Sequence, residues 1–194
     1  VRALIEAGAD ANKAMDNGRT PLYIAAENGH ETVVRSLIEL GADVSMATVN
    51  GGTPLWIAAQ KGHETIVRAL IEAGADANKA MDNGMTPLYI AAENGHETVV
   101  RALIEAGADV NKEKDNGVTP LLITAQNGHA AVVRALIKAG ADVNNATVNG
   151  ATPLFISAKE GHETIVRALI EAGADANKAM DNGMTPLYIA AENG

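Results

Sequence analysis

Residues 18–44 read GRTPLYIAAENGHETVVRSLIELGADV, and this pattern returns every 33 residues along the 194-residue chain. A fixed period of this length indicates a repeat architecture and organises the chain more strongly than any local motif. The repeating Thr-Pro-Leu tripeptide begins at Thr20, Thr53, Thr86, Thr119, Thr152 and Thr185, with no insertion between copies. The chain therefore divides into five complete units and two half units, which are 16–48, 49–81, 82–114, 115–147 and 148–180, with halves at 1–15 and 181–194.

The turn and capping residues predict two helices in each unit. The Asn-Gly dipeptide at 17–18 favours a tight turn, because both residues tolerate positive φ. Thr20 suits the N-cap position, and Pro21 suits the first helical position, where its missing N–H costs nothing. We expect this first helix to end before Gly29 and a second helix to begin near His30.

Apolar and charged side chains are expected on opposite faces of the second helix. At helical spacing the apolar stripe contains Val33, Val34, Leu37 and Ile38, and the charged row contains Glu31, Arg35 and Glu39. A unit made of a turn and two helices cannot enclose such a stripe, so each unit must pack against its neighbours. The sequence predicts an all-α repeat solenoid over residues 1–194, with no linker and no second domain.

The repeated residues resemble the ankyrin repeat family over the whole chain. The matching pattern is G-x-TPL-x-x-AA-x-x-GH followed by VV-x-x-L-x-x-x-GADVN, in units of 33 residues. This resemblance implies a non-catalytic scaffold that binds a protein or peptide through a concave groove of first helices and turn tips. It also implies one possible modification, hydroxylation of Asn78 or Asn177.

The composition limits the classes of partner. A formal net charge of −9 argues against a large phosphate-binding surface, and no apolar run reaches the roughly 20 residues that span a bilayer. We therefore expect neither nucleic-acid binding nor membrane insertion. The absence of cysteine suits a reducing compartment, which favours a cytoplasmic protein. Because the chain opens on VRALIEAG without a methionine, we expect both true ends to be missing.

The five histidines all follow a glycine at the start of the second helix, at His30, His63, His96, His129 and His162. A ladder of metal or acid–base sites is one interpretation. However, helices pack about 8–10 Å apart, whereas a zinc ligand lies about 2 Å from its ion, so neighbouring units cannot share a metal. Within one unit, a valine stands where a zinc helix needs its second histidine. We interpret these side chains as neutral histidines that start the buried stripe and hydrogen-bond to backbone at the interhelix loop. With no cysteine and no repeated serine as nucleophile, we expect no enzyme.

An aromatic column follows the Thr-Pro-Leu tripeptide, at Tyr23, Trp56, Tyr89, Phe155 and Tyr188, with Leu122 in the remaining unit. Ankyrin repeats usually carry a histidine at this position, and that histidine joins adjacent repeats by hydrogen bonds. The substitutions put this hydrogen-bond ladder in doubt, and neither Leu122 nor Phe155 can form it. Two interpretations stay open for the rings, which either cap the core between units or contact a partner.

The turn tips vary most between units, and by analogy with the family we expect them to be exposed. The tip positions are Asp16, Asn17 and Arg19; Val49, Asn50 and Gly52; Asp82, Asn83 and Met85; Asp115, Asn116 and Val118; Val148, Asn149 and Ala151; and Asp181, Asn182 and Met184. The first-helix positions beside them are Glu27, Gln60, Lys61, Glu93, Gln126, Lys159, Glu160 and Glu192.

This mixture of apolar tips and acids suggests a protein ligand, such as a basic amphipathic segment, more than a small metabolite. The alternative, that the tips have drifted without touching a ligand, stays open. The predicted protein-binding residues are Arg19, Tyr23, Val49, Trp56, Lys61, Met85, Tyr89, Val118, Leu122, Phe155, Met184 and Tyr188.

A longer period lies inside the 33-residue one. Residues 63–95 recur without change as 162–194, and ATVNG at 47–51 returns at 146–150, so the larger block is three units long. Duplication of a three-unit segment, in a natural gene or by design, would produce this pattern, and it predicts equivalent patches about 30 Å apart. The two half units are nearly complementary and could dock head to tail between molecules. The alternative function is therefore a structural spacer or array that self-associates end to end.

Overall fold

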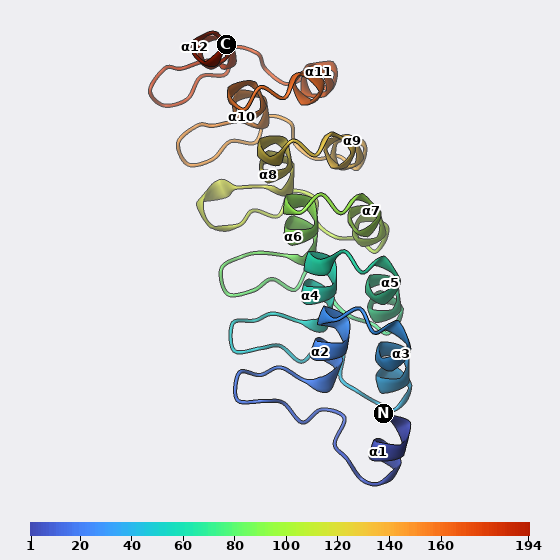
Figure 1. The fold of residues 1–194 in the computed structure, drawn as a ribbon. Coiled ribbons are helices and arrows are strands. Elements are labelled where there is room, and N and C mark those ends of the chain that lie inside the picture. Colours follow the sequence, from blue (N-terminus) through green and yellow to red (C-terminus); the bar gives the residue numbers. More distant parts are fainter.

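The computed structural model describes all 194 residues as a stack of helix pairs (Figure 1). A short helix, α1 (Arg2–Glu6), begins the stack. The first helices of the units are α2 (Pro21–Glu27), α4 (Pro54–Lys61), α6 (Pro87–Glu93), α8 (Pro120–Asn127), α10 (Pro153–Lys159) and α12 (Pro186–Asn193). The second helices are α3 (Glu31–Glu39), α5 (Glu64–Glu72), α7 (Glu97–Glu105), α9 (Ala130–Lys138) and α11 (Glu163–Glu171).

The helices form two parallel rows, with the hairpin loops on the far side of the first helices (Figure 1). A short 3-10 turn, η1 (Asp115–Gly117), lies at the tip of one hairpin, and the structure contains no β-strand. The predicted all-α solenoid is therefore confirmed. None of the helices is long and apolar enough to cross a membrane.

The threonine caps form as the sequence predicts. The Thr20 hydroxyl oxygen accepts a hydrogen bond from the backbone N–H of Tyr23 at 3.1 Å, and the same bond recurs in every unit. Each of these threonines is followed by proline at the first helical position. The second helices start one residue after their histidine, without a side-chain cap. The repeated TP pair therefore fixes where every first helix begins.

The core is shared between units. One cluster of 35 buried residues extends from Leu22 in α2 to Leu169 in α11, so no unit has a core of its own. Of the predicted stripe, Val34 and Leu37 are buried, whereas Val33 and Ile38 are half-buried and pack against the cluster. Such sharing is the reason that single repeats do not fold alone.

The outer face of the second helices carries the predicted charged row. Arg35 pairs with Glu31 at 2.9 Å, and the corresponding pairs form in α5, α7 and α11. Arg68 also reaches the next unit and pairs with Glu105 at 3.0 Å. These side chains are exposed, so each pair contributes less than about 1 kcal/mol to stability.

Asparagines in the loops after the second helices join one unit to the next. The Asn78 Oδ1 atom accepts the Asp109 N–H at 2.8 Å, and its Nδ2 donates to the Gly107 carbonyl at 3.1 Å. We call this series of bonds the loop ladder, and its other members connect Asn12 to Asp43, Asn111 to Asp142 and Asn144 to Asp175. In unit 16–48 the asparagine is replaced by Ser45, which forms no equivalent bond to Asp76. A cavity of about 310 Å³ lies between these two residues.

Candidate protein-binding surface

The hairpin tips are Asn-Gly turns of two kinds. In the first kind, the Asn17 side-chain oxygen accepts the Arg19 N–H at 3.1 Å. In the second kind, the Thr48 hydroxyl oxygen accepts the Gly52 N–H at 3.0 Å. The first kind recurs at Asn83 and Asn182, and the second recurs at Thr147. The residue before the turn therefore decides how each tip is held.

Successive tips are joined edge to edge by backbone hydrogen bonds. The Val49 N–H donates to the Asn17 carbonyl at 3.1 Å, and the Asp82 N–H donates to the Asn50 carbonyl at 3.1 Å. The same bond joins Val148 to Asn116 and Asp181 to Asn149. No such bond links Asp115 to Asn83, and at this tip Asn116 adopts a left-handed φ of 76°, the only positive φ outside glycine. Asparagine is among the residues that tolerate this conformation.

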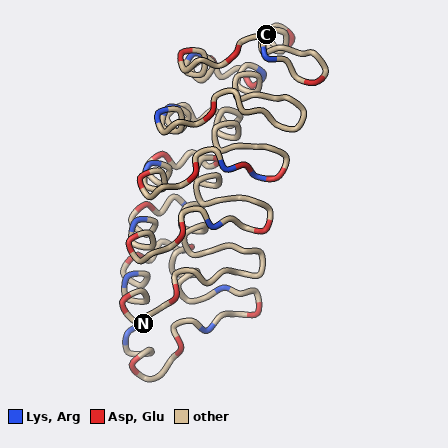
Figure 2. Tube along the Cα trace, turned by 180° about the vertical axis from the view of Figure 1, so that it is seen from behind, with Lys and Arg blue, Asp and Glu red and all other residues tan.

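The tips expose valines and unpaired acids. Val49 is 66% exposed and Val148 is 70% exposed, whereas the core valines are buried. The other four tips carry an aspartate that forms no ion pair, at Asp16, Asp82, Asp115 and Asp181. Figure 2 shows these four acidic tips in red, with the two valine tips in tan between them. Apolar and acidic contacts are thus both free to meet a partner.

The ends of the first helices add further charges beside the tips. Arg19 pairs with Glu27 at 3.2 Å, and Lys159 pairs with Glu160 at 3.2 Å. Lys61 is exposed and forms no ion pair. We call the surface formed by the hairpin tips and these helix ends the tip face.

The aromatic column is buried between units. Tyr23, Trp56, Tyr89, Leu122 and Phe155 are only 2–6% exposed, and Tyr188 is 57% exposed in the last half unit. Neighbouring cations cover two of the rings, since Arg19 lies 5.3 Å from the Tyr23 ring centre and Lys114 lies 5.6 Å from the Tyr89 ring centre. Direct contact between these rings and a partner stays a prediction. Their burial shows that they pack the seams between units.

Burial also alters the chemistry of the column. Burial raises the pKa of Tyr89 to about 12, and the nearby Glu93 carboxylate acts in the same direction. Burial likewise raises the pKa of Tyr23, although Arg19 opposes the shift. The buried Trp56 indole N–H has no hydrogen-bond acceptor in the protein.

The expectation that every tip position is exposed is wrong for the residue just before each threonine. Gly52 and Ala151 are buried, whereas Arg19, Met85, Val118 and Met184 are half-buried. The reason is the adjacent unit. A side chain on Gly52 would lie 3.8 Å from the Tyr23 ring and 3.9 Å from the Met81 methyl group. This position therefore belongs to the seams between units.

Val148 is exposed like Val49 but is absent from the predicted binding residues. The signal that could have found it is the ATVNG pentapeptide, which surrounds both valines. The predicted binding residues lie along the whole tip row. Only Arg19, Tyr23 and Glu27 come together in one cluster of contacts.

A family model described as ankyrin repeats (3 copies) matches residues 1–48, 44–114, 74–147, 111–180 and 141–194, which together cover the whole chain. The chain belongs to the ankyrin repeat family. A search of curated proteins gave no match. Ankyrin repeats generally mediate protein–protein interactions, and proteins built from them are generally non-catalytic interaction scaffolds.

The histidines join successive ankyrin repeats. With its proton on Nε2, His96 donates to the Gln60 carbonyl of the preceding unit at 3.0 Å. The equivalent contacts run from His63 to Glu27, from His129 to Glu93 and from His162 to Gln126. We call these contacts the histidine rungs. The predicted backbone hydrogen bond is therefore present, but its acceptor lies in the neighbouring unit and not in the histidine's own loop.

The first histidine differs from the other four. The expectation that every imidazole is turned away from solvent is wrong for His30, which is exposed because no first helix precedes it in the stack. The other four rings are half-buried. No three His, Asp or Glu side chains gather in a way that could hold a metal ion.

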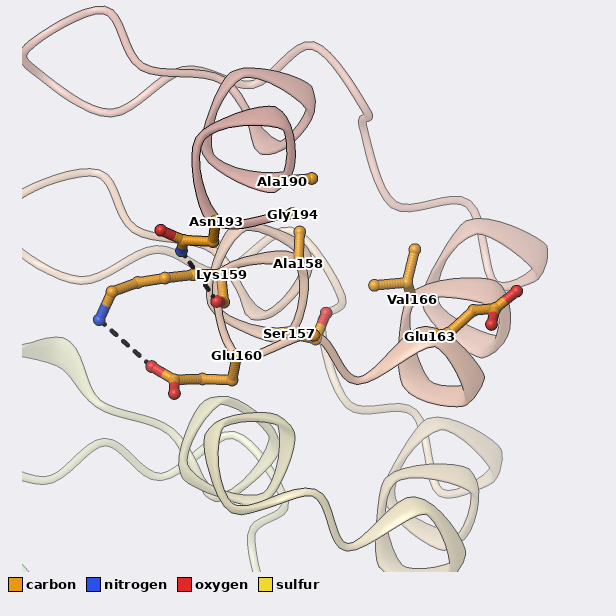
Figure 3. Close-up of a pocket in the computed structure, with 10 residues that line it drawn as sticks. Ser157, Ala158, Lys159, Glu160, Glu163, Val166, Ala190, Asn193 and Gly194 are labelled. Carbon is orange, nitrogen blue, oxygen red and sulfur yellow. Dashed lines mark hydrogen bonds and ion pairs between the residues drawn. The ribbon is translucent and has the colours of Figure 1, made fainter.

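A hollow of about 390 Å³ lies between α10, α11 and α12 (Figure 3). Lys159 pairs with Glu160 at its edge, and the Asn193 side chain donates to the Lys159 carbonyl at 3.0 Å. In the interior of the stack, the glycine that corresponds to Gly161 lies against the histidine of the next unit, as Gly128 does against His162. The hollow is therefore the empty position of a histidine rung.

Proposed function

We propose that this ankyrin repeat chain is a non-catalytic scaffold that binds a protein or peptide along its tip face. The observation that carries the proposal is the row of tips with exposed Val49 and Val148 and four unpaired aspartates. Elsewhere most exposed charges are already paired, as on the outer face of the second helices. Free apolar and charged groups in one row offer both area and electrostatic selectivity to a partner.

Site-specific photocrosslinking tests this proposal. A photoreactive residue at Asn50 lies on the tip face, and a matched one at the exposed Thr65 lies on α5, away from the tips. We expect covalent adducts with a protein partner from position 50 and not from position 65. Equal adducts from both positions, or adducts from position 65 alone, would contradict binding through the tip face.

The exposed end surfaces favour a second candidate function, a structural array that associates end to end. Leu4 is 67% exposed at one end of the stack, and Leu187 is 77% exposed at the other. Two such surfaces would meet head to tail, and this contact extends without closing. Static light scattering of the chain should then show a mass that grows with concentration, and Leu187→Glu should reduce the growth. A monomer at every concentration would rule this function out.

A further inference from the structure

The two valine tips stand at equivalent places in the three-unit block. Val49 and Val148 lie within the repeated ATVNG segments, three units apart. Both are among the most exposed apolar residues of the chain, and both are held by the same Thr–backbone turn. The structure therefore repeats an apolar contact point at a fixed separation.

Acidic tips flank each valine. Asp16 and Asp82 occupy the tips on either side of Val49, and Asp115 and Asp181 occupy those on either side of Val148 (Figure 2). Along the tip face the order is therefore acid, valine, acid, acid, valine, acid. None of the four carboxylates has an ion-pair partner within the chain. A partner that covers the valines must also supply positive charge, since unpaired carboxylates would otherwise lose water without compensation.

The separation of the valines limits the shape of the partner. Helices of adjacent units pack about 10 Å apart, so three units place the two tips about 30 Å apart. An α-helix rises about 1.5 Å per residue, so this distance corresponds to about 18–20 residues. Residues separated by 18 lie on the same helix face, because 18 residues complete about five turns. A single straight helix can thus present one apolar side chain to each valine.

We propose that the tip face binds a basic amphipathic helix with two apolar anchor residues about 18 positions apart, one on Val49 and one on Val148. Lysine or arginine residues between the anchors face Asp82 and Asp115. This inference rests on the proposed function and adds the chemistry of the partner. Two weak contacts on one rigid rod reinforce each other, because the second contact forms within the complex.

The test uses two synthetic lysine-rich helical peptides of 26 residues with identical composition. The first carries leucine at positions 4 and 22, and the second carries leucine at positions 4 and 20. A shift of two residues rotates the second leucine by about 200°, to the opposite face of the helix. Fluorescence anisotropy at about 150 mM salt, where exposed charges are screened beyond about 8 Å, measures the Kd of each peptide.

We expect the first peptide to bind at least tenfold tighter than the second. Val148→Ser should remove most of this difference and leave the second peptide unaffected. The matched control is Ile170→Ser, which removes an exposed apolar side chain from α11 and should change neither Kd. Equal binding of the two peptides, or equal effects of the two variants, would overturn the inference. Crosslinking from Asn50 would still report on the tip face, so failure of the peptide test alone leaves the proposed function standing.

Discussion

Replacing Ser45 with asparagine is expected to close the gap in the loop ladder. At the equivalent position, Asn78 bonds to the Asp109 N–H at 2.8 Å and to the Gly107 carbonyl at 3.1 Å. A hydrogen bond contributes about 0.5–1.5 kcal/mol net, and exposed bonds fall in the lower half of that range. Two new bonds should therefore raise the free energy of unfolding by about 1–2 kcal/mol. The cavity of about 310 Å³ beside Ser45 gives the longer side chain room.

Urea denaturation followed by circular dichroism measures this effect. Ser45→Asn should move the midpoint to higher urea with an unchanged slope, and thermal unfolding should shift upward by roughly 2–6 °C for a chain of this size. The reverse change, Asn78→Ser, is the matched control and should lower the midpoint by a similar amount. If Asn78→Ser is destabilising but Ser45→Asn has no effect, the missing side chain is not what interrupts the ladder. If both changes are neutral, the loop ladder does not stabilise the stack.

Three further outcomes are expected. Because burial raises the pKa of Tyr89 to about 12, its stabilisation is complete below pH 10 and is lost as the pH rises to about 12; urea midpoints at pH 9 and pH 11 should differ less for Tyr89→Phe. His96→Ala removes a histidine rung and should cost about 1–3 kcal/mol, whereas His30→Ala, at an exposed site, should stay within about 0.5 kcal/mol in the same denaturation assay; equal losses would show that the rung is not responsible. Gly95→Ala should destabilise more than Gly161→Ala, since both have a left-handed φ but only the first would bring a methyl group within 2.7 Å of a histidine ring; identical midpoints would contradict this steric account.

The sequence predicts whatever is decided inside one unit. The Thr20 cap, the position of Pro21 and the apolar stripe depend only on neighbours three or four residues away, and the structure contains all of them. Because the units repeat without insertion, one correct unit gives the whole solenoid.

The relations between units were harder to predict. The burial of Gly52 depends on Tyr23 and Met81 from the two adjacent units, and no local pattern contains that information. The histidine rung of His96 likewise ends on a carbonyl 36 residues away. The aromatic column shows the same limit, because helical spacing places a ring such as Trp56 at the edge of its own unit, and only the neighbouring unit makes it buried.

Every bond of the loop ladder and every histidine rung spans a constant number of residues, 31 for the first and 36 for the second. If unit 82–114 were excised, Asn78 would face Asp142 and His129 would face the Gln60 carbonyl at the same separations. Unequal recombination between units can therefore lengthen or shorten the protein without redesigning any joint. Selection on such a chain can act on the number and order of its valine and aspartate tips, and hence on its valency.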